Sequence, residues 1–405
     1  MGGRRVRIGV REPAATLRRV NDPTPRTRPP RQEQEPASEE IAEVAPGVLR
    51  MQLPIWMPGL GHVNMYGLVD DTGIAVVDPG LPGPQSWKAL KQRLGAAGYR
   101  IRDVHTVVVT HSHPDHFGGA GRLAREAGAR LVTHRAFATW TVKGPSAQRA
   151  LSDEEARRLE LEAAAFAQAV DAAEEIPTIE DDAIVEEEQT TSGGWGRPTP
   201  WGTVTDGPPF KRRMMIRAMR FLFTPPEPTQ RVQHGERLVI GRREWRVVHT
   251  PGHTVDHLCL WDPEHGTLLT GDHVLPSITP HVSGVREADS LRSYLATLAL
   301  VADLPDVRLG LPAHGHPFAD VPGRVAAIAE HHAERMDLLR RAGLAIGPAT
   351  VPALSREVFP QRHWGTMAES ETFAHLEHLV HAGGAERYEE DGMLVYRMAT
   401  ESDAA

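Results

Sequence analysis

The sequence has a single cysteine, no long apolar run and no apolar segment behind its N-terminal arginines. Cys259 stands alone among 405 residues, so no intrachain disulfide can form, and its strand-like surroundings predict a buried position. No stretch approaches the roughly 18 apolar residues that a membrane span needs. A secretory signal requires an apolar core after its basic residues, and none follows here. These absences predict a cytoplasmic protein that does not bind membranes.

The chain also lacks an excess of basic charge. Its 45 lysines and arginines are outnumbered by 53 aspartates and glutamates, which gives a net charge of -8. Such a balance provides no general attraction for phosphate backbones or anionic membranes. We therefore expect a small molecule, rather than a nucleic acid, as the partner. A chain of this length can hold one domain of about 250 residues with additions.

Residues 110–116 hold the highest density of potential metal ligands. They read Thr-His-Ser-His-Pro-Asp-His and follow an apolar, β-branched run that is typical of a buried strand. His111 and His113 project to the same side of an extended backbone, so one cation can bind both. Asp115 and His116 follow on the next turn, where a second cation can bind. Imidazole and carboxylate without thiolate suit zinc, and also iron or manganese.

Three further candidate ligands follow, each directly after its own strand-like run. His253 stands in Gly-His-Thr, Asp272 in Gly-Asp and His314 in Ala-His-Gly. In order and context, these motifs and the preceding His-x-His-x-Asp-His resemble the metallo-β-lactamase-fold hydrolases, which include glyoxalase II-like and β-lactamase-like enzymes. The resemblance covers roughly residues 45 to 320. Each of the last three motifs alone is a weak signal, whereas the complete set is specific.

The resemblance implies a dinuclear metal site. Its ligands, carried over residue by residue, are His111, His113 and His253 for one ion, Asp115, His116 and His314 for the other, and Asp272 as a bridge. Two such ions hold a shared water, lower its pKa and present hydroxide as the nucleophile, while they polarise the bond under attack. Asp115 would also orient that hydroxide, so Asp115 and Asp272 are the candidate catalytic residues. Zinc is the expected metal, with two ions per chain.

Other histidines near these motifs receive supporting roles. His249 and His257 lie in strand-like runs and are interpreted as core groups or as groups that orient ligands. His273 is not part of the ligand set of the family, and we interpret it as a flanking residue. His316 is the rival of His314 for the second ion, and the Ala-His-Gly context favours His314.

Composition divides the chain into a tail, a catalytic domain and a C-terminal module. Residues 1–42 are rich in arginine and proline and are predicted to be disordered. Residues 43–320 alternate strands with helices, which indicates an α/β fold. The resemblance implies a four-layer αβ/βα sandwich, with two mixed sheets back to back and helices outside. Asp78 follows the opening strands, and in that family it is a structural residue rather than a ligand.

A long insert, about residues 140–230, separates the first ligands from the later ones. It contains an acidic helical stretch, a loop rich in Gly, Trp and Pro that ends at Trp201, and a basic amphipathic piece over residues 210–221. Opposite charges predict that these segments pack on each other or on a partner subunit. A homodimer is therefore one of the alternatives. A lid over the pocket and a plain surface elaboration are both compatible with this pattern.

Residues 321–400 are predicted to form a winged-helix-like α+β module. Three helices, at 321–341, 350–358 and 369–381, precede a hairpin around an Asp-Gly turn, and a subset of the family carries such a domain. The third helix has Glu369, Glu371 and Glu377 but no lysine or arginine, so it would meet phosphates with the wrong sign. Docking near the pocket is therefore favoured over DNA binding. All predicted ligands lie outside the module, so it is not expected to be needed for metal binding.

The predicted function is a dinuclear-metal hydrolase that uses a metal-bound hydroxide on a thioester, ester or lactone, for example an acyl-thioester. A single-iron sulfur dioxygenase of the same fold would keep most of these ligands and stays an alternative. A non-catalytic winged-helix regulator is an alternative of a different class. A flavin-coupled di-iron enzyme is disfavoured by His113, a nuclease by the acidic balance, and a true β-lactamase by Asp272 and the missing export signal.

Overall fold

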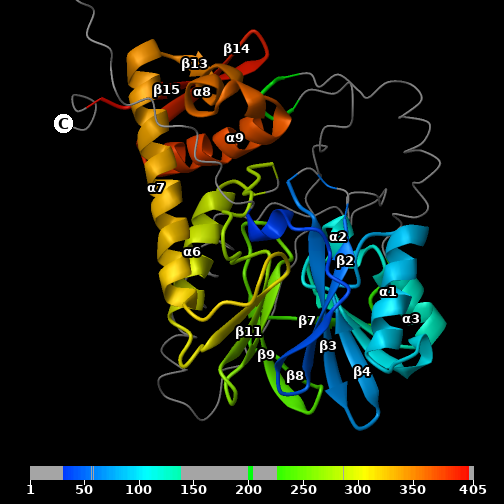
Figure 1. Cartoon of the computed structure of the whole chain (residues 1–405). Coiled ribbons are helices and arrows are strands. Elements are labelled where there is room, and N and C mark those ends of the chain that lie inside the picture. Colours follow the sequence, from blue (N-terminus) through cyan, green and yellow to red (C-terminus); the bar gives the residue numbers. More distant parts are fainter. Residues whose placement is uncertain are drawn as a thin grey trace, which may run out of the picture. The chain divides into compact units, whose positions relative to one another are not determined.

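Two β-sheets pack face to face in the computed structural model, which describes residues 31–137, 199–203 and 226–400 except Trp56, Pro58 and Arg286 (Figure 1). In the described residues, the first sheet has seven strands in the order β1 to β7, and the second has five in the order β12-β11-β10-β9-β8. The first sheet consists of β1 (Ile41–Ala45), β2 (Val48–Pro54), β3 (His62–Asp70), β4 (Gly73–Val77), β5 (Val104–Val108), β6 (Arg130–His134) and β7 (Gln230–Val232). The second consists of β8 (Arg237–Ile240), β9 (Arg243–His249), β10 (Leu258–Asp262), β11 (Thr267–Gly271) and β12 (Leu309–Pro312).

Helices cover the outer face of each sheet and complete four layers. The first sheet carries α1 (Pro84–Ala96) and α3 (Ala120–Ala127), and the second carries α6 (Ser290–Ala302) and α7 (Val321–Ile346) (Figure 1). The short helix α2 (Pro114–Phe117) follows β5. The predicted α/β sandwich is therefore confirmed. Among the described residues, no helix is both long and apolar enough to cross a membrane.

The sheets are mixed, and their central strands are buried on both faces. In β5, Val107 belongs to the core beneath α1 and α3, whereas Val108 belongs to the core between the sheets. In β9, Val247 faces the core between the sheets and Val248 faces the helical side of the second sheet. This alternation follows from the two-residue period of a strand. A strand covered on both faces reads as a continuous apolar run, as these do.

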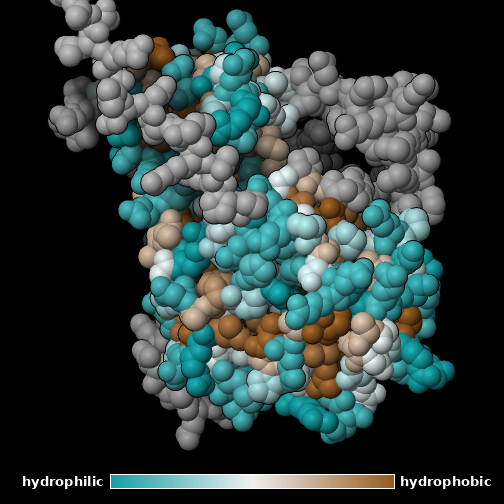
Figure 2. Space-filling view, in the orientation of Figure 1, coloured by the Kyte–Doolittle hydropathy of each residue, from teal (hydrophilic) through white to brown (hydrophobic). Residues whose placement is uncertain are grey.

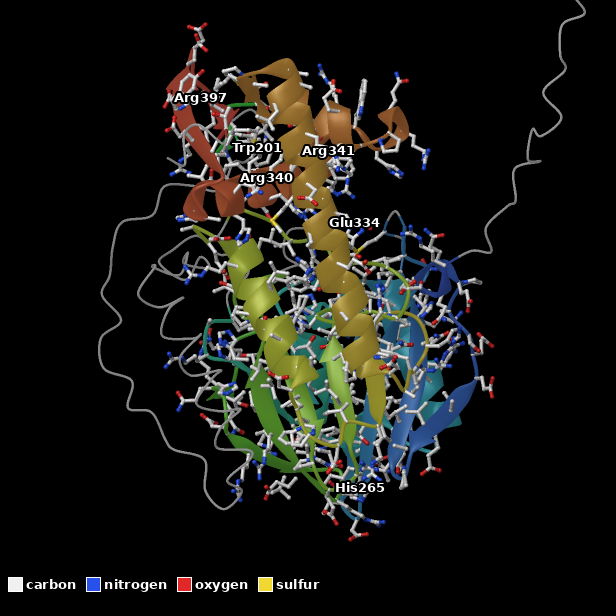
Figure 3. The ribbon with its side chains drawn as sticks, turned by 90° about the vertical axis from the view of Figure 1, so that its left-hand side faces the viewer. Trp201, His265, Glu334, Arg340, Arg341 and Arg397 are labelled. Atoms are coloured by element: carbon white, nitrogen blue, oxygen red, sulfur yellow. The ribbon has the colours of Figure 1, made fainter. Side chains whose placement is uncertain are left out.

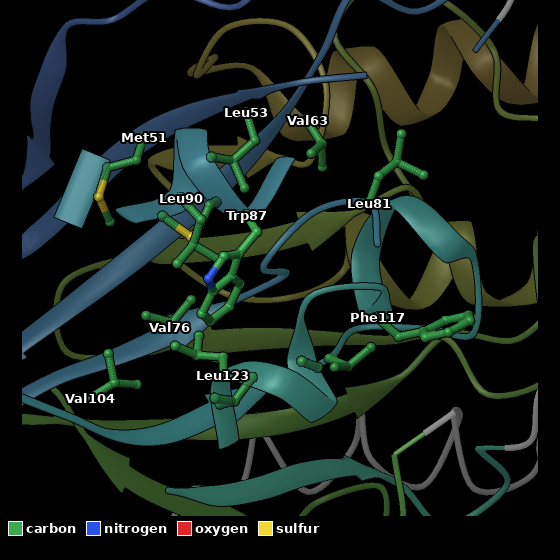
Figure 4. Packing of buried hydrophobic residues seen from close by; sticks show 14 of the residues in the cluster. Met51, Leu53, Val63, Val76, Leu81, Trp87, Leu90, Val104, Phe117 and Leu123 are labelled. Carbon is green, nitrogen blue, oxygen red and sulfur yellow. The ribbon is translucent and has the colours of Figure 1, made fainter. Parts of the chain in front are cut away.

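The packing beneath α1 and α3 shows how a helix covers the sheet (Figure 4). Trp87 and Leu90 of α1 and Leu123 of α3 meet Val76 of β4 and Met51 of β2. Each of these side chains is almost fully buried, and burying such a side chain contributes roughly 1.5–3 kcal/mol. This core fixes the sheet from which the first four ligands project.

The predicted tail is too long. Residues 31–40 form the 3-10 helix η1 (Gln32–Gln34) and an extended segment that leads into β1. Glu33 is fully buried and accepts hydrogen bonds from the amides of Ser277 and Ile278 at 2.8 and 3.1 Å, and from the Ser277 hydroxyl. A buried carboxylate with three donors is a specific anchor, which holds this segment against residues 277 and 278. Residues 1–30 lie outside the described residues.

The C-terminal residues form the three helices and the hairpin that the sequence predicts, in the same order, and one further short strand, β13 (Ala349–Thr350). After α7 come β13, α8 (Val351–Val358), α9 (Thr366–His381), β14 (Ala385–Glu390) and β15 (Met393–Met398), with the strands in the order β13-β15-β14. On the face drawn in Figure 2, most of the coloured side chains of the C-terminal region are hydrophilic. The winged-helix interpretation of this module stays a prediction.

Helix α7 connects this C-terminal region to the sandwich without a break. Val325 and Ile328, in its first half, belong to the core over the second sheet. Leu339, in its second half, belongs to the core of the C-terminal region. One helix therefore contributes to two cores, and the domain boundary at residue 321 stays a prediction.

Trp201 anchors the predicted insert on the C-terminal region (Figure 3). Its side chain is 1% exposed and packs on Phe373 with ring centroids 5.3 Å apart. The indole Nε1 donates to Glu369 Oε2 at 3.0 Å, and the Trp201 carbonyl accepts from the Leu394 amide at 3.2 Å. Most of the insert, including its acidic and basic segments, lies outside the described residues.

We expect Trp201→Ala to lower the free energy of unfolding by about 3–5 kcal/mol, as is usual for a buried aromatic side chain. The matched control is Trp364→Ala, because Trp364 is 46% exposed in the same region and should cost less than about 1 kcal/mol. Unfolding followed by circular dichroism measures both variants. Equal losses would contradict the anchoring role of Trp201.

Candidate metal centre

All seven predicted ligands meet at one edge of the sandwich. Each lies just beyond the carboxyl end of a strand: four after β5, and one each after β9, β11 and β12. Loops at these ends leave the sheets on the same side, which is where α/β sheets commonly bind ligands. The structure forms two groups whose ligand atoms lie within 4.8 Å of one another: His111, His113, His253 and Asp272; and Asp115, His116 and His314.

The first group has the spacing that one tetrahedral ion requires. His111 Nε2 lies 3.0 Å from His113 Nδ1, which in turn lies 3.1 Å from His253 Nε2. Metal–nitrogen bonds of about 2.0–2.1 Å at tetrahedral angles place nitrogens about 3.3 Å apart. The three imidazoles therefore fit a single ion with little adjustment.

The second group is similarly compact. Asp115 Oδ2 lies 3.6 Å from His116 Nε2 and 3.5 Å from His314 Nε2. Both of these imidazole nitrogens are buried and have no hydrogen-bond partner among the described residues. Buried polar atoms without a partner are rare and need an explanation. A metal ion would give both nitrogens a partner, so the residues present fit the expected group.

Asp272 lies between the two groups. Its Oδ1 is 3.3 Å from His314 Nε2, and its Oδ2 is 3.4 Å from His116 Nε2 and 3.6 Å from His253 Nε2. One carboxylate thus reaches imidazoles of both sets. This is the position that a bridging ligand requires.

A hydrogen bond at the opposite ring nitrogen orients several of the imidazoles. His116 Nδ1 donates to Asp78 Oδ2 at 2.8 Å. His253 Nδ1 donates to the His281 carbonyl at 2.7 Å. Such a bond places the proton on Nδ1, which leaves Nε2 free to bind a metal.

His314 is oriented in the same way, by the main chain of His62. His314 Nδ1 donates to the His62 carbonyl at 2.6 Å, and the Gly315 amide donates to His62 Nε2 at 3.1 Å. The His62 ring is itself held, because its Nδ1 donates to the Glu35 carbonyl at 2.7 Å. The N-terminal segment therefore supports a predicted metal ligand through one intermediate residue.

Asp78 lies behind the ligands, as expected. Its φ is 54°, a conformation that few non-glycine residues adopt. The carboxylate accepts from the Thr110 amide at 2.9 Å and from the Thr110 hydroxyl at 2.7 Å, in addition to His116. One side chain thus fixes both the start of the ligand loop and the orientation of one ligand.

His257 positions Asp272. Its Nε2 accepts from the Asp272 amide at 3.0 Å, and its Nδ1 donates to the Thr250 hydroxyl at 2.7 Å. Gly271 allows this approach: its φ is 51°, and a Cβ there would lie 2.6 Å from His257 Nε2. Glycine is therefore required before Asp272 for steric reasons. His257 is a group that orients a predicted ligand.

Burial and charge act in opposite directions on the titration of the site. Burial raises the pKa of Asp272, but His314 and His116 outweigh it and hold that pKa well below its usual range. Burial lowers the pKa of His116, but the carboxylates of Asp272, Asp115 and Asp78 outweigh it and raise the pKa. Burial and the neighbouring imidazoles lower the pKa of His111. The negative charge of Asp272 and the imidazoles around it therefore stabilise each other.

The remaining histidines near the motifs lie outside both groups. His316 donates to Glu35 Oε2 at 2.9 Å and accepts from Arg50 at 3.1 Å, so the geometry favours His314 for the metal. His249 donates to the Val255 carbonyl at 2.8 Å and stacks on His134. His273 is buried with its ring 5.0 Å from that of Tyr294.

Sequence reasoning missed the main-chain supports of the ligands. His62 and His281 act through their carbonyl oxygens, which every residue type possesses. No side-chain pattern could therefore have identified them. Glu33 and Glu35 were missed for a different reason, because the surrounding composition predicts disorder.

Comparison with known proteins agrees with this geometry. Residues 58–314 match the metallo-beta-lactamase superfamily. Among curated relatives, the "Lactamase-like protein adaB" of Aspergillus niger is 34% identical over 113 residues, which cover 28% of this chain and 33% of that protein. The "Lactamase-like protein vrtG" of Penicillium aethiopicum is 32% identical over 143 residues, which cover 33% of this chain and 44% of that protein. The chain thus matches less than half the length of these relatives.

Two solved structures resemble much more of the chain. A metallo-beta-lactamase family protein from Thermus thermophilus is 28% identical with a TM-score of 0.62, covering 87% of this chain and 99% of its own. A beta-lactamase domain protein from Burkholderia ambifaria is 27% identical with a TM-score of 0.64, covering 91% and 97%. The family match covers residues 58–314, which is more than half of the chain, and the fold agrees with it. The chain therefore belongs to the metallo-beta-lactamase superfamily.

Proposed function

We propose that the chain is a dinuclear-metal hydrolase that acts on a thioester, ester or lactone. The observation that carries the proposal is the set of buried ligand atoms around Asp272, two of which are imidazole nitrogens without a partner among the described residues. A group of imidazoles and carboxylates without thiolate suits two zinc ions, and also iron or manganese. Such ions, when bound, lower the pKa of a shared water and polarise the bond under attack.

The residues around the two groups have different roles in the proposed reaction. Asp272 lies 3.3–3.6 Å from imidazole nitrogens of both sets and would hold both ions. Asp115 lies within 3.6 Å of the nitrogens of its own set and presents a second carboxylate to the shared centre. His249 is an unsuitable general base, because burial lowers its pKa to about 3 and its Nε2 already donates to a carbonyl.

Charge supports this substrate class over a polyanion. The net charge of -8 gives no general attraction for phosphate backbones. The bridging Asp272 is typical of the wider hydrolase family. A carbonyl substrate of small or acyl-bearing type is therefore favoured over a nucleic acid.

The first prediction of this proposal concerns metal content. We expect about two ions per chain in the purified protein, and a loss of the bridge in Asp272→Ala that leaves at most one ion and little activity. The matched control is Asp262→Ala, which removes an equally buried carboxylate that pairs with Arg243 at 2.7 Å away from the site. Elemental analysis of the folded fraction measures both variants. One iron per fully active chain would instead support the dioxygenase.

The second prediction concerns the substrate. In a screen of thioesters, lactones, phosphodiesters and β-lactams, we expect turnover of a thioester, ester or lactone. A chelator should abolish it and added zinc should restore it, because the metal supplies the nucleophile. Turnover of phosphodiesters or β-lactams alone would show that the substrate class is wrong.

The third prediction concerns pH. We expect kcat to rise with a single apparent pKa of about 6–8, the range of water bound to zinc. His249→Gln should leave this profile in place, because a group whose pKa is about 3 does not titrate between pH 5 and 8. Loss of turnover in that variant with both ions retained would require a side-chain base.

A further inference from the structure

Residues 275–285, named here the clamp loop, lie between the metal centre and the C-terminal region. The clamp loop follows β11 and precedes α6, and it contains no helix or strand. It supplies the His281 carbonyl that accepts the Nδ1 proton of His253 at 2.7 Å. The orientation of one predicted metal ligand therefore depends on where this loop is held.

The C-terminal helix α9 holds one end of the clamp loop. Glu371 Oε2 lies 3.9 Å from His281 Nδ1, and the hydroxyls of Ser283 and Ser370 are 3.1 Å apart. Contact with the helix is close at Gly284, where a Cβ would lie 2.8 Å from Phe373. A side chain at this position would push the loop away from α9.

Other elements hold the first half of the clamp loop. Arg324 of α7 donates to the carbonyls of Leu275 and Ile278, both at 2.6 Å. Glu33 accepts from the Ser277 and Ile278 amides. The loop is thus fixed on both sides of His281, and on the α9 side the charged contact to His281 comes from Glu371.

Glu371 is itself held in place and charged. Its Oε1 lies 3.8 Å from Arg335 Nε, and its carbonyl accepts from His375 Nδ1 at 2.7 Å. Burial raises the pKa of Glu371, but the contacts with His281, His375 and Arg335 outweigh it and lower the pKa to about 2. The side chain is therefore a carboxylate at neutral pH, facing an imidazole.

We propose that Glu371 is a positioning residue for the metal ligand His253, acting through His281, and that the C-terminal region is thereby part of the metal centre. This rests on the proposed dinuclear site. It differs from the expectation that residues 321–400 are not needed for metal binding. Without the Glu371 contact, the His281 side chain loses its charged partner, and the His281 carbonyl holds the tautomer and ring plane of His253 less firmly.

The test measures metal affinity, which needs no substrate. The full-length protein, stripped of metal, is titrated with zinc against a competing chelator, and cobalt spectra report the ligand environment of each ion. In Glu371→Ala and in His281→Ala, we expect about tenfold weaker binding of one ion, since losing a partner that orients a ligand costs 10–100-fold. Binding of the other ion should stay unchanged.

The double variant shows whether the two residues act as one unit. If Glu371 acts through His281, replacing both should weaken the ion no more than the more severe single change. Additive losses would overturn the proposal, as would equal weakening of both ions.

Glu377→Ala is the matched control. Glu377 lies on the same helix and is more deeply buried than Glu371. It pairs with Tyr396 at 2.6 Å and with Arg387 rather than with the clamp loop. We expect it to lower the thermal stability without changing metal affinity. A loss of affinity equal to that of Glu371→Ala would reduce Glu371 to a general stability role. A wild-type chain that fails to bind two ions would instead overturn the dinuclear centre itself, which separates the two failures.

Discussion

The burial of one carboxylate, Asp272, governs how the rest of the site is built. A charged group removed from water costs several kcal/mol unless opposite charge and hydrogen bonds compensate for it. Asp272 is 6% exposed, and imidazoles from three loops converge on it. Each ring must present a bare nitrogen to the centre, and several are fixed by a partner at the opposite nitrogen. The positions of Asp78, His62 and His281 follow from that requirement.

The ligands could be predicted from the sequence because their chemistry restricts residue type. Only a few side chains bind a hard or borderline cation, and a strand end followed by such a side chain is a readable pattern. The groups that orient the ligands could not be predicted, because their chemistry does not restrict the residue type in this way. His62 and His281 support the ligands through carbonyl oxygens, and a carbonyl is common to every residue type. Glu371 contributes a side chain, but its sequence context, an acidic helix far from the ligands, carries no mark of the loop that it faces.

Composition also misled at the N-terminus. An arginine- and proline-rich segment cannot bury a core of its own, which is why disorder is the sound expectation. Residues 31–35 nevertheless adopt a defined conformation, because a single buried carboxylate, Glu33, satisfies three donors of the clamp loop. The N-terminal segment is held by polar groups of the clamp loop, namely the Ser277 and Ile278 amides and the Ser277 hydroxyl. The N-terminal segment and α9 thus reach the same loop from opposite ends of the described chain.

The glutamates of α9 form contacts within the protein, which changes how their charge is interpreted. The sequence suggests that Glu369, Glu371 and Glu377 repel phosphates, yet each has an internal partner: Trp201, His281 and Arg387 respectively. In the described stretch from residue 368 to 380, no side chain is exposed. A helix that reads DNA needs a free face to enter the major groove, and α9 has none here. Its inaccessibility, more than its charge, therefore favours a helix that supports the metal centre over one that recognises a nucleic acid.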